Sequence, residues 1–488
     1  MIDHCSPKWE IFTGTKMQVS NWWAKTIDDL EIVSIKKLKT KHPDVNFYVS
    51  MDFYEYFKNI SQKNNLAFPI QPLHSKMSLK TKSEIVAIIG TPESLIINSC
   101  NYSRDNPIII ITIPVESVLL KFNMLKQPIN PIQYSHMCFP FVPFAKCLYL
   151  PVGPFTKLFF EEPLHEKSSI KAALLALTYL FGSFRRTYGI GDISSVLAEG
   201  FLDSIDASLP PAPNNLIIID RSVDFPGAFK ASGTYFGLAE EFLKFDYSVF
   251  SLQSSIQAEL FQTMTSVFGV DDETSKEISL LTLEEAKKRT DTVSRMSTYQ
   301  SSLKAIHKNL ISIIEGKLKT NYLSVLFQQV QNLETEALGK GRILTLDDNG
   351  PNLAFRALTM LYSKKSKEVN DFAQYIGSYF KIPTFAKWAR IESFLNKSSP
   401  ISIPEIVFSI LSNGIKKGKP VVEPFYQSTN TQIPDDPQRW FIVVLGGLTG
   451  HEIMEMETKI KVFRPKDDFI IIPTEVSSPS TYMNTLLS

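Results

Sequence analysis

The stretch LIIIDRSVDF, residues 216–225, joins a fully apolar run to a cluster of charged residues. Leu216–Ile219 has the length and composition of a buried strand, and it is followed by Asp220, Arg221 and Asp224. A continuous rather than alternating apolar run indicates that both faces of the strand are covered, as in the parallel sheets of α/β domains. Charged side chains directly after such a strand lie at the sheet edge where α/β proteins usually bind ligands.

This charged cluster allows two interpretations. In the structural one, Arg221 forks onto the carboxylates of Asp220 and Asp224 and holds the following loop in place. In the catalytic one, the two carboxylates perform acid–base chemistry or bind a metal, as in a hydrolase or a glycosyl-transfer enzyme. That chemistry needs a partner such as a histidine or a phosphate loop, and the lone Gly189 and Gly191 pair, with no clear strand before it, is a weak signal. We therefore expect a structural cluster out of solvent, with no catalytic residue, metal or cofactor.

Five further short runs share the character of the first strand. They are rich in Ile and Val, are bounded by turn residues and comprise Phe47–Met51, Glu84–Ile89, Ile108–Ile113, Phe441–Leu445 and Phe469–Ile472. Three of them precede residue 115 and two lie near the end of the chain. This distribution predicts α/β material on parallel sheets early in the chain, and an α/β domain whose sheet is completed by strands from the end of the chain.

Between these strand regions, apolar residues recur every three to four positions, which predicts helices with one apolar face each. One stripe contains Leu252, Ile256, Leu260, Met264 and Val267, and a second contains Leu303, Ile306, Leu310, Ile313, Leu318 and Leu323. We predict one long helix over Thr298–Glu336, or two helices broken near Gly316. The order places boundaries near 128, 226 and 397, with α/β segments at 1–128, 129–226 and 397–488 and a mainly helical insertion at 227–396.

The overall composition excludes several classes of protein. The 51 basic and 50 acidic residues nearly cancel, which gives no reason to expect nucleic-acid binding. Four cysteines without a CxxC pair favour free thiols in a reducing compartment. The longest aliphatic run, Ile108–Ile113, is far below the ~20 apolar residues of a membrane span, and the first residues do not resemble a secretory signal. We expect a soluble, cytoplasmic protein that reaches membranes only through partners.

Linked motifs in the second half of the chain resemble those of the SM (Sec-one/Munc-eighteen) family. LIIIDRSVD resembles that family's strand-and-loop signature, and a TYxGLxxE element follows with Thr234, Tyr235 and Gly237 at the matching offset. The segment 180–199 resembles the part of SM proteins that contains a helix, a Tyr-Gly-x-Gly turn and a second helix. The segments 439–453 and 468–487 resemble the family's last strands, a Gly-Gly turn and the closing helix. The chain is identified as a divergent or shortened member.

The resemblance implies an arch of two doubly wound parallel-sheet domains, the second interrupted by a mainly helical third. Domain 1 would be 1–128, domain 2 would be 129–226 with 397–488, and domain 3 would be 227–396 with a hairpin at about 255–338. The family's activity is binding, not catalysis. Domain 1 and a central cleft would hold a syntaxin-type SNARE, and the domain 3 hairpin would offer a groove to syntaxin-type and vesicle-type SNARE helices. The hairpin stripe residues Leu303, Ile306, Leu310 and Ile313 are the candidate contacts, although such residues are more often hairpin core. Asp220, Arg221, Asp224, Thr234, Tyr235 and Gly237 would then form a structural signature.

The motifs Gly-Gly-x-Thr-x-x-Glu-Ile and Ile-Ile-x-x-Thr look closest to vacuolar protein sorting-associated protein 33. That branch implies a subunit of the HOPS and CORVET tethering complexes, docked on vacuolar protein sorting-associated protein 16 and peripheral on endosome, lysosome or vacuole membranes. Two alternatives remain within the family: an SM protein of a Golgi, endoplasmic reticulum or plasma-membrane step, and an SM-like scaffold that does not bind SNAREs. An enzyme using Asp220 and Asp224 is a third.

Overall fold

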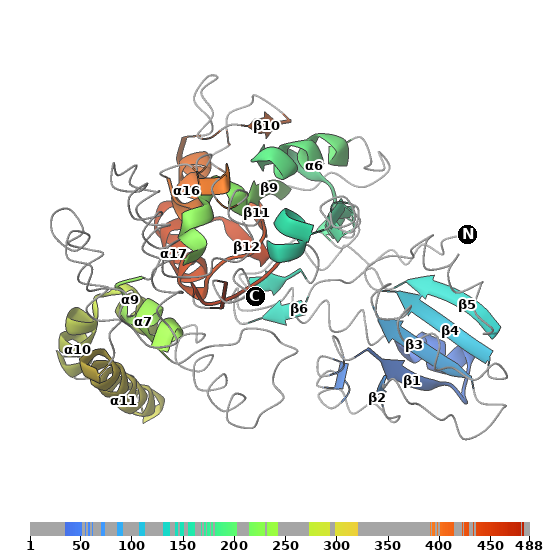
Figure 1. The fold of residues 1–488 in the computed structure, drawn as a ribbon, viewed down its shortest axis with the longest axis horizontal. Helices are drawn as coiled ribbons and strands as arrows, with labels where there is room; N and C mark the ends of the chain where they lie inside the picture. Colours follow the sequence, from blue (N-terminus) through green and yellow to red (C-terminus); the bar gives the residue numbers. More distant parts are fainter. Residues whose placement is uncertain are drawn as a thin grey trace, which may run out of the picture.

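The structure is a computed structural model, and it describes the chain in segments. The longer segments are residues 35–50, 85–90, 107–112, 130–136, 155–161, 181–202, 214–229, 232–242, 273–292, 298–320, 401–413, 424–428 and 436–479, with shorter pieces between some of them. Figure 1 shows three bodies: a first sheet near the N-terminus, a second sheet and a layer of helices. No helix in the described segments is both long and apolar enough to cross a membrane.

The first sheet has five parallel strands in the order β2-β1-β3-β4-β5 within the described residues. Its strands are β1 (Asn46–Val49), β2 (Ile70–Pro72), β3 (Val86–Gly90), β4 (Pro107–Thr112) and β5 (Asn130–His136). The three strands predicted before residue 115 are confirmed as β1, β3 and β4. The sequence did not reveal β2, which is only three residues long, or β5, whose sequence NPIQYSH is largely polar. Since β5 belongs to this sheet, the sheet extends just beyond the domain boundary expected near 128.

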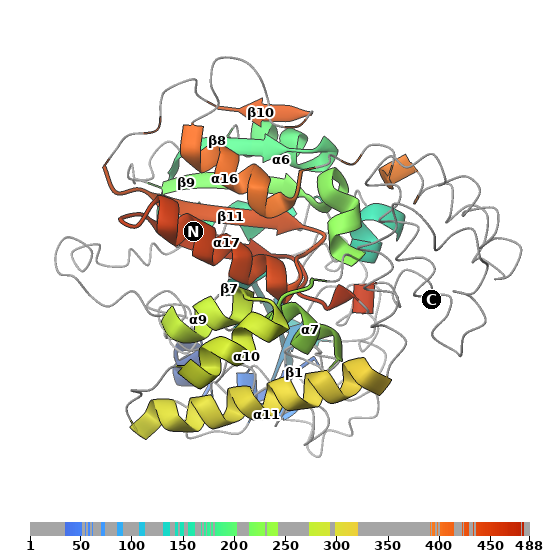
Figure 2. The ribbon, with the colours of Figure 1, turned by 90° about the vertical axis from the view of Figure 1, so that its left-hand side faces the viewer.

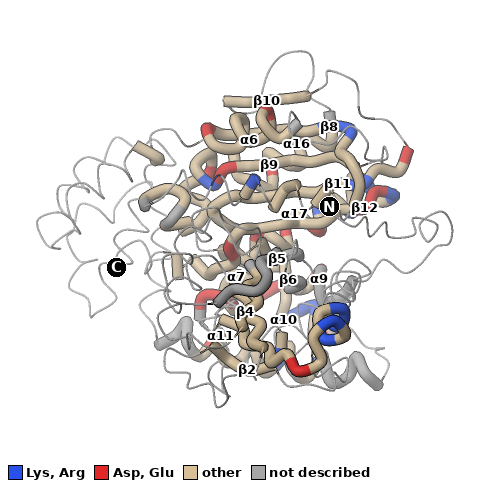
Figure 3. Tube along the Cα trace, turned by 90° about the vertical axis from the view of Figure 1, so that its right-hand side faces the viewer, with Lys and Arg blue, Asp and Glu red and all other residues tan. Residues whose placement is uncertain are grey.

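The second sheet combines strands from two distant parts of the chain. It contains β8 (Phe184–Ile190), β9 (Asn214–Asp220), β10 (Phe425–Gln427), β11 (Arg439–Leu445) and β12 (Asp468–Pro473), in the order β10-β8-β9-β11-β12. All pairs are parallel except β10 with β8 at the edge. The strands predicted at Leu216–Ile219, Phe441–Leu445 and Phe469–Ile472 are confirmed. In Figure 3 these strands are mostly free of charge, with charged residues concentrated near their ends.

Strand β8 corrects two expectations. Residues 180–199 were expected to begin with a helix, and no strand was expected before Gly189. The structure instead places Phe184–Ile190 in the sheet beside β9. The apolar run is interrupted here by Arg185 and Arg186, so the pattern does not resemble a buried strand. Arg186 is nevertheless buried, and its Nη1 donates to Asn215 Oδ1 at 3.3 Å, which compensates the loss of water.

Both faces of the second sheet are covered, as continuous apolar strands require. One apolar core lies between the sheet and α6 (Asp192–Leu202), together with Phe155 and Phe159. The opposite core lies beneath α16 (Ile403–Asn413) and α17 (Gly450–Phe463). Figure 2 shows α16 and α17 in front of the second sheet. All seven residues of β9, at the centre of the sheet, are buried.

A helical layer is inserted in sequence between β9 and β10. It contains α7 (Tyr235–Phe242), α9 (Glu273–Leu280), α10 (Leu283–Thr292) and α11 (Thr298–Thr320), which share one apolar core. Helix α11 continues through Gly316 without a break, and it forms the outer edge of the layer in Figure 2. The predicted stripe from Leu252 to Val267 and the part of the expected hairpin beyond residue 320 lie outside the described residues.

The turn from β11 into α17 depends on two glycines. Gly446 and Gly447 have φ values of 81° and 85°, a conformation that side chains with a Cβ rarely adopt. A Cβ on Gly447 would also collide with the Tyr482 hydroxyl and the Glu475 carbonyl. The Tyr482 hydroxyl donates to the Gly446 carbonyl at 3.3 Å, and the Gly446 N–H donates to Thr474 Oγ1 at 2.8 Å. The predicted Gly-Gly turn is confirmed, and close packing fixes its path.

We predict that Gly447→Ala lowers the free energy of unfolding by about 2 kcal/mol or more, because strain and steric overlap add. Gly316→Ala is the matched control. It lies in α11 with no atom near its Cβ position, so the change should stabilise the protein by up to about 1 kcal/mol. Urea denaturation of the two variants measures both effects, and equal stabilities would contradict the prediction.

Candidate functional site

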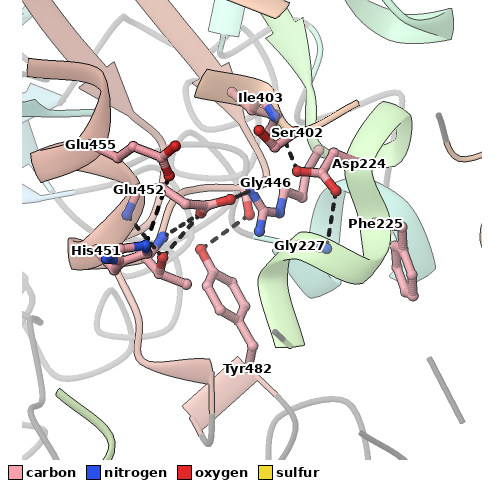
Figure 4. A network of polar contacts seen from close by, with 12 residues as sticks. Asp224, Phe225, Gly227, Ser402, Ile403, Gly446, His451, Glu452, Glu455 and Tyr482 are labelled. Atoms are coloured by element: carbon pink, nitrogen blue, oxygen red, sulfur yellow. Dashed lines mark hydrogen bonds and ion pairs between the residues drawn. The ribbon is translucent and has the colours of Figure 1, made fainter. Parts of the chain in front are cut away.

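The charged cluster of LIIIDRSVDF lies at the carboxyl edge of the second sheet, where α6, α16 and α17 all begin. Backbone N–H groups in the first turn of a helix have no partner within the helix. At this edge each of the three helices receives a buried carboxylate at its N-terminus. Figure 4 shows part of the resulting network, with Asp224, Ile403, Glu452 and Tyr482 converging from separate elements.

Asp220, the last residue of β9, caps α6. Its fully buried carboxylate accepts from the backbone N–H groups of Ile193 at 2.6 Å and Ser194 at 3.0 Å, and from the Ser194 hydroxyl. Gly191, with a φ of 104°, leaves room for the carboxylate, because a Cβ there would overlap it. A strand therefore does lead into the Gly-x-Gly segment. The helix N-terminus at which a phosphate would bind is filled by the protein's own Asp220.

Asp224 performs the same role for α16 across a separation of 179 residues. Its carboxylate accepts from the Gly227 N–H at 3.1 Å and from the Ile403 N–H, in the first turn of α16, at 3.1 Å. The first contact closes the short helical turn that follows β9 (Arg221–Phe229), and the second fixes α16 to it. One side chain thus joins the loop after β9 to a segment that follows the helical insertion.

Arg221 pairs with a carboxylate that the sequence analysis did not consider. Its Nη1 donates to Glu452 Oε1 of α17 at 2.7 Å, and both side chains are buried. The expected fork onto Asp220 and Asp224 does not form. Asp220 faces α6, and Asp224 makes its hydrogen bonds to Gly227 and Ile403 and interacts with Arg221 through charge. Burial alone would lower the pKa of Arg221, but the charges of Glu452 and Asp224 outweigh it and raise that pKa. The guanidinium remains charged.

Glu452 also completes a capping box at the start of α17. Its Oε2 accepts from the Thr449 N–H at 2.9 Å, while the Glu452 N–H donates to Thr449 Oγ1 at 3.3 Å. Both carboxylate oxygens are thus engaged, one by Arg221 and one by the helix start. Glu452 thus adds a side-chain link between the loop after β9 and the start of α17, beside the strand pairing of β9 with β11.

The second signature element holds the start of α7. Thr234 Oγ1 accepts from the Gly237 N–H at 3.2 Å, and Gly237 packs so closely on Ser232 that a Cβ would not fit. The buried Tyr235 hydroxyl lies 3.1 Å from His307 Nδ1 of α11. Burial raises the pKa of Tyr235, so the hydroxyl stays protonated. Tyr235 thus connects α7 to the helix that carries the second apolar stripe.

Sequence reasoning missed Glu240, which lies one position before the glutamate of the TYxGLxxE element. Its carboxylate accepts from the N–H groups of Gly450 at 2.7 Å and His451 at 3.3 Å, at the start of α17. Two consecutive acidic residues in a short helix were the available signal. The donors lie 210 residues away in sequence, so the pairing could not be inferred from the pattern.

The two signature aspartates are electrostatically unusual. Burial raises the pKa of Asp220 to about 7, against the lowering effect of its hydrogen bonds from Ser194 and Ile193. Burial raises the pKa of Asp224 to about 7 as well, against the opposing charge of Arg221. Such shifts also occur in catalytic carboxylates. Here, however, both oxygens of each group are bound by the protein's own donors, and neither side chain is open to a substrate.

Metal binding has no support in the described segments, since no cluster of three or more His, Cys, Asp or Glu side chains there could hold an ion. Because Asp220, Asp224 and Arg221 are engaged by partners within the protein, the structural interpretation of the charged cluster fits its geometry better than the catalytic one. The side chains serve as helix caps and as ion-pair partners between elements.

The four candidate residues of the α11 stripe have different environments. Leu310 is buried in the core that α11 shares with α7 and α9, so it stabilises the layer. Ile313 is 38% exposed. The side chains of Leu303 and Ile306 lie outside the described residues. Of the two that are described, only Ile313 is available to a partner.

Comparison with known proteins identifies the fold. No protein-family model matches the sequence, and no curated protein matches it either. Among solved structures, Unc18 from its complex with syntaxin 1 of Monosiga brevicollis matches with a TM-score of 0.61 at 10% identity. That match covers 95% of this chain and 98% of the other. The chain has the fold of SM proteins.

Two more SM proteins support this assignment. The SM protein Vps45, solved with the Qa SNARE Tlg2, matches with a TM-score of 0.56 at 11% identity, covering 95% of this chain and 97% of Vps45. Sly1p, solved with an N-terminal peptide of Sed5p, matches with a TM-score of 0.55 at 12% identity, covering 92% and 93%. The predicted SM-type α/β fold, with its second sheet interrupted by helices, is confirmed.

The raised carboxyl pKa values predict a pH dependence of stability. The folded pKa of Asp220 lies above its unfolded value of about 3.9, so between pH 4 and 7 the folded protein retains a proton that the unfolded chain releases. The free energy of unfolding should fall as pH rises through this window, by roughly 1 kcal/mol per pH unit and group. In Asp220→Asn this slope should be shallower.

Denaturant titrations at several pH values between 4.5 and 7.5 measure the slope in each protein. Glu199→Gln, which removes an exposed carboxylate from the same helix α6, is the control and should keep the wild-type slope. If the free energy of unfolding of Asp220→Asn depends on pH as steeply as that of the wild type, the raised pKa of Asp220 is refuted.

The buried pair Arg221–Glu452 predicts strong non-additivity. Arg221→Met leaves the Glu452 carboxylate buried without its cation and should cost about 3–5 kcal/mol of stability. The double variant Arg221→Met with Glu452→Gln removes the stranded charge and should recover much of that loss. Lys288→Met, which breaks an exposed pair with Glu284, should leave stability unchanged. If the double variant loses as much free energy of unfolding as the two single variants lose together, Arg221 and Glu452 do not interact as proposed.

Proposed function

We propose that this chain is an SM-type regulator of intracellular membrane fusion that binds SNARE helices. The observation that carries the proposal is the likeness of fold over at least nine tenths of the chain to three SM proteins. Unc18 was solved with syntaxin 1, and Vps45 with the Qa SNARE Tlg2. The proposal transfers this syntaxin-type class of partner to the present chain, and it adds vesicle-type SNARE helices because the resemblance to SM proteins implies them.

The outward face of α11 is the surface we propose for the SNARE helix. Its buried side consists of residues such as Leu310 and Ile314, which leaves Ile313 among the exposed polar and small residues Ala305, Lys308, Asn309, Ser312 and Gly316. A partner helix recognised in this way places apolar anchors at helical spacing against such a face. Small side chains allow the two helix backbones to approach closely, and Ile313 supplies an apolar contact.

The engaged carboxylates support a binding role over an enzymatic one. Asp220, Asp224 and Glu452 stabilise helix starts and connect elements, and they offer no open carboxylate to a substrate. We therefore propose that the family signature preserves the scaffold of the second sheet. Binding would take place on the surfaces that this scaffold displays.

A narrower proposal concerns the trafficking step. The resemblance of segments 439–453 and 468–487 to vacuolar protein sorting-associated protein 33 supports an assignment to the HOPS and CORVET tethering complexes. In that case the protein binds vacuolar protein sorting-associated protein 16 and is peripheral on endosome, lysosome or vacuole membranes. Affinity purification of the full chain from its own cells tests this. Recovery of another set of trafficking factors would assign it to a different SM branch.

We predict that Ile313→Glu weakens binding of the cognate SNARE helices at least about tenfold, because a charge replaces an apolar contact at the centre of the proposed surface. Its stability should stay within about 0.5 kcal/mol of the wild type, since the side chain is exposed. Calorimetry or biolayer interferometry with recombinant SNARE helices encoded by the same genome measures the affinity.

Val196→Glu is the matched control. Val196 is another exposed aliphatic residue. It lies on α6, which covers the second sheet and is not part of the helical layer, so its replacement should leave SNARE affinity unchanged. Wild-type protein that binds none of the SNAREs would favour the scaffold alternative. Equal affinities of wild type and Ile313→Glu would reject the α11 surface while leaving the SM assignment intact.

A further inference from the structure

The start of α17 is capped from two different parts of the chain. Thr449 and Glu452 satisfy each other's backbone N–H groups within the capping box. The two N–H groups between them, of Gly450 and His451, donate instead to Glu240. Half of this capping arrangement is therefore local, and half is supplied by the helical layer.

Glu240 is well placed to make this contact strong. It lies on α7, is 1% exposed, and uses one oxygen for Gly450 at 2.7 Å and the other for His451 at 3.3 Å. A carboxylate at a helix N-terminus gains both charge-assisted hydrogen bonds and the favourable helix dipole. Because Glu240 is buried, water does not compete for its two hydrogen bonds. These bonds therefore fix the position of α7 relative to the start of α17.

Two further contacts lie at the same place. Thr234 Oγ1, at the start of α7, is 3.2 Å from His451 Nδ1. Met454, one turn further along α17, is buried in the core formed by α7, α9 and α11. We call this group the α7–α17 joint: Glu240 and Thr234 on one side, and Gly450, His451 and Met454 on the other. It connects the helical insertion to the second sheet through polar and apolar contacts together.

We infer that Glu240 is a positioning residue that sets the orientation of the helical layer, and with it the proposed SNARE-binding face of α11, relative to the second sheet. The inference rests on the proposed function for its effect on binding, but not for its effect on orientation. Tyr235 follows Thr234 directly and contacts His307 of α11, so a shift at the joint is transmitted to that helix. Partner affinity depends on Glu240 although Glu240 touches no partner.

The test uses Glu240→Gln in the full chain, because glutamine keeps the shape but removes the charge and turns one acceptor into a donor facing an N–H group. Spin labels at the exposed positions Ser312 on α11 and Val462 on α17 report the distance between the two bodies. We expect a broadened or shifted distance distribution and a SNARE affinity lower by about fivefold to tenfold.

Two controls separate positioning from general destabilisation. Glu285→Gln removes the charge from the local capping box that Thr282 and Glu285 form at the start of α10, and it should change neither the distance distribution nor the affinity. Ile442→Val removes a buried methylene from β11 and lowers stability without touching the joint, so it should also keep both properties. His451→Ala, which removes the ring contact with Thr234, should give a smaller change in the same direction as Glu240→Gln.

The outcomes distinguish this inference from the proposed function. A wild-type distance distribution in both Glu240→Gln and His451→Ala would overturn the positioning role. An altered distribution with unchanged SNARE affinity would overturn the link to binding. Failure of the wild-type protein to bind SNAREs, together with an altered distribution in the variants, would reject the proposed function and keep the joint. If Glu240→Gln does not fold, His451→Ala alone decides.

Discussion

Buried carboxylates bound to helix N-termini organise the second half of this protein. Asp220, Asp224 and Glu240 each accept from backbone N–H groups of a helix that begins at one edge of the second sheet. An ionised carboxylate in the interior is costly unless hydrogen bonds and positive charge surround it. Here the first turns of α6, α16 and α17 supply the hydrogen bonds, and Arg221 adds positive charge beside Asp224.

This arrangement explains how a domain split in sequence assembles as one body. Strands β8 and β9 precede the helical insertion and β11 and β12 follow it, yet β9 lies between β8 and β11. Hydrogen bonding between strands aligns them but does not hold the helices. The pairs Arg221–Glu452 and Asp224–Ile403 connect the two parts at the point where the loops leave the sheet. The insertion is attached to the same edge through Glu240.

Much of the fold was predictable because apolar patterning is local. The six continuous apolar runs became parallel strands in the two sheets, and the helical spacing from 298 onward became α11. The strands that the pattern missed are short, polar or interrupted by charge. The sequence FRRTYGI of β8 does not look like a buried strand, because it contains two arginines. Arg186 can be buried there because β9 lies beside it and provides a hydrogen-bond partner, Asn215.

For the candidate site, sequence alone determined which residues matter in the charged cluster and that they would lie at the end of a buried strand. The linked signature elements, by their resemblance to SM proteins, also indicated the fold that the comparison of structures then established. The pairings were decided only by the tertiary structure: Arg221 with Glu452, Asp224 with Ile403 and Glu240 with Gly450. Each joins groups roughly 180 to 230 residues apart. The group that a buried charge contacts depends on how distant segments pack, and the neighbouring sequence does not show this. The stretch LIIIDRSVDF therefore indicated the fold, but not the residues that its charged side chains contact.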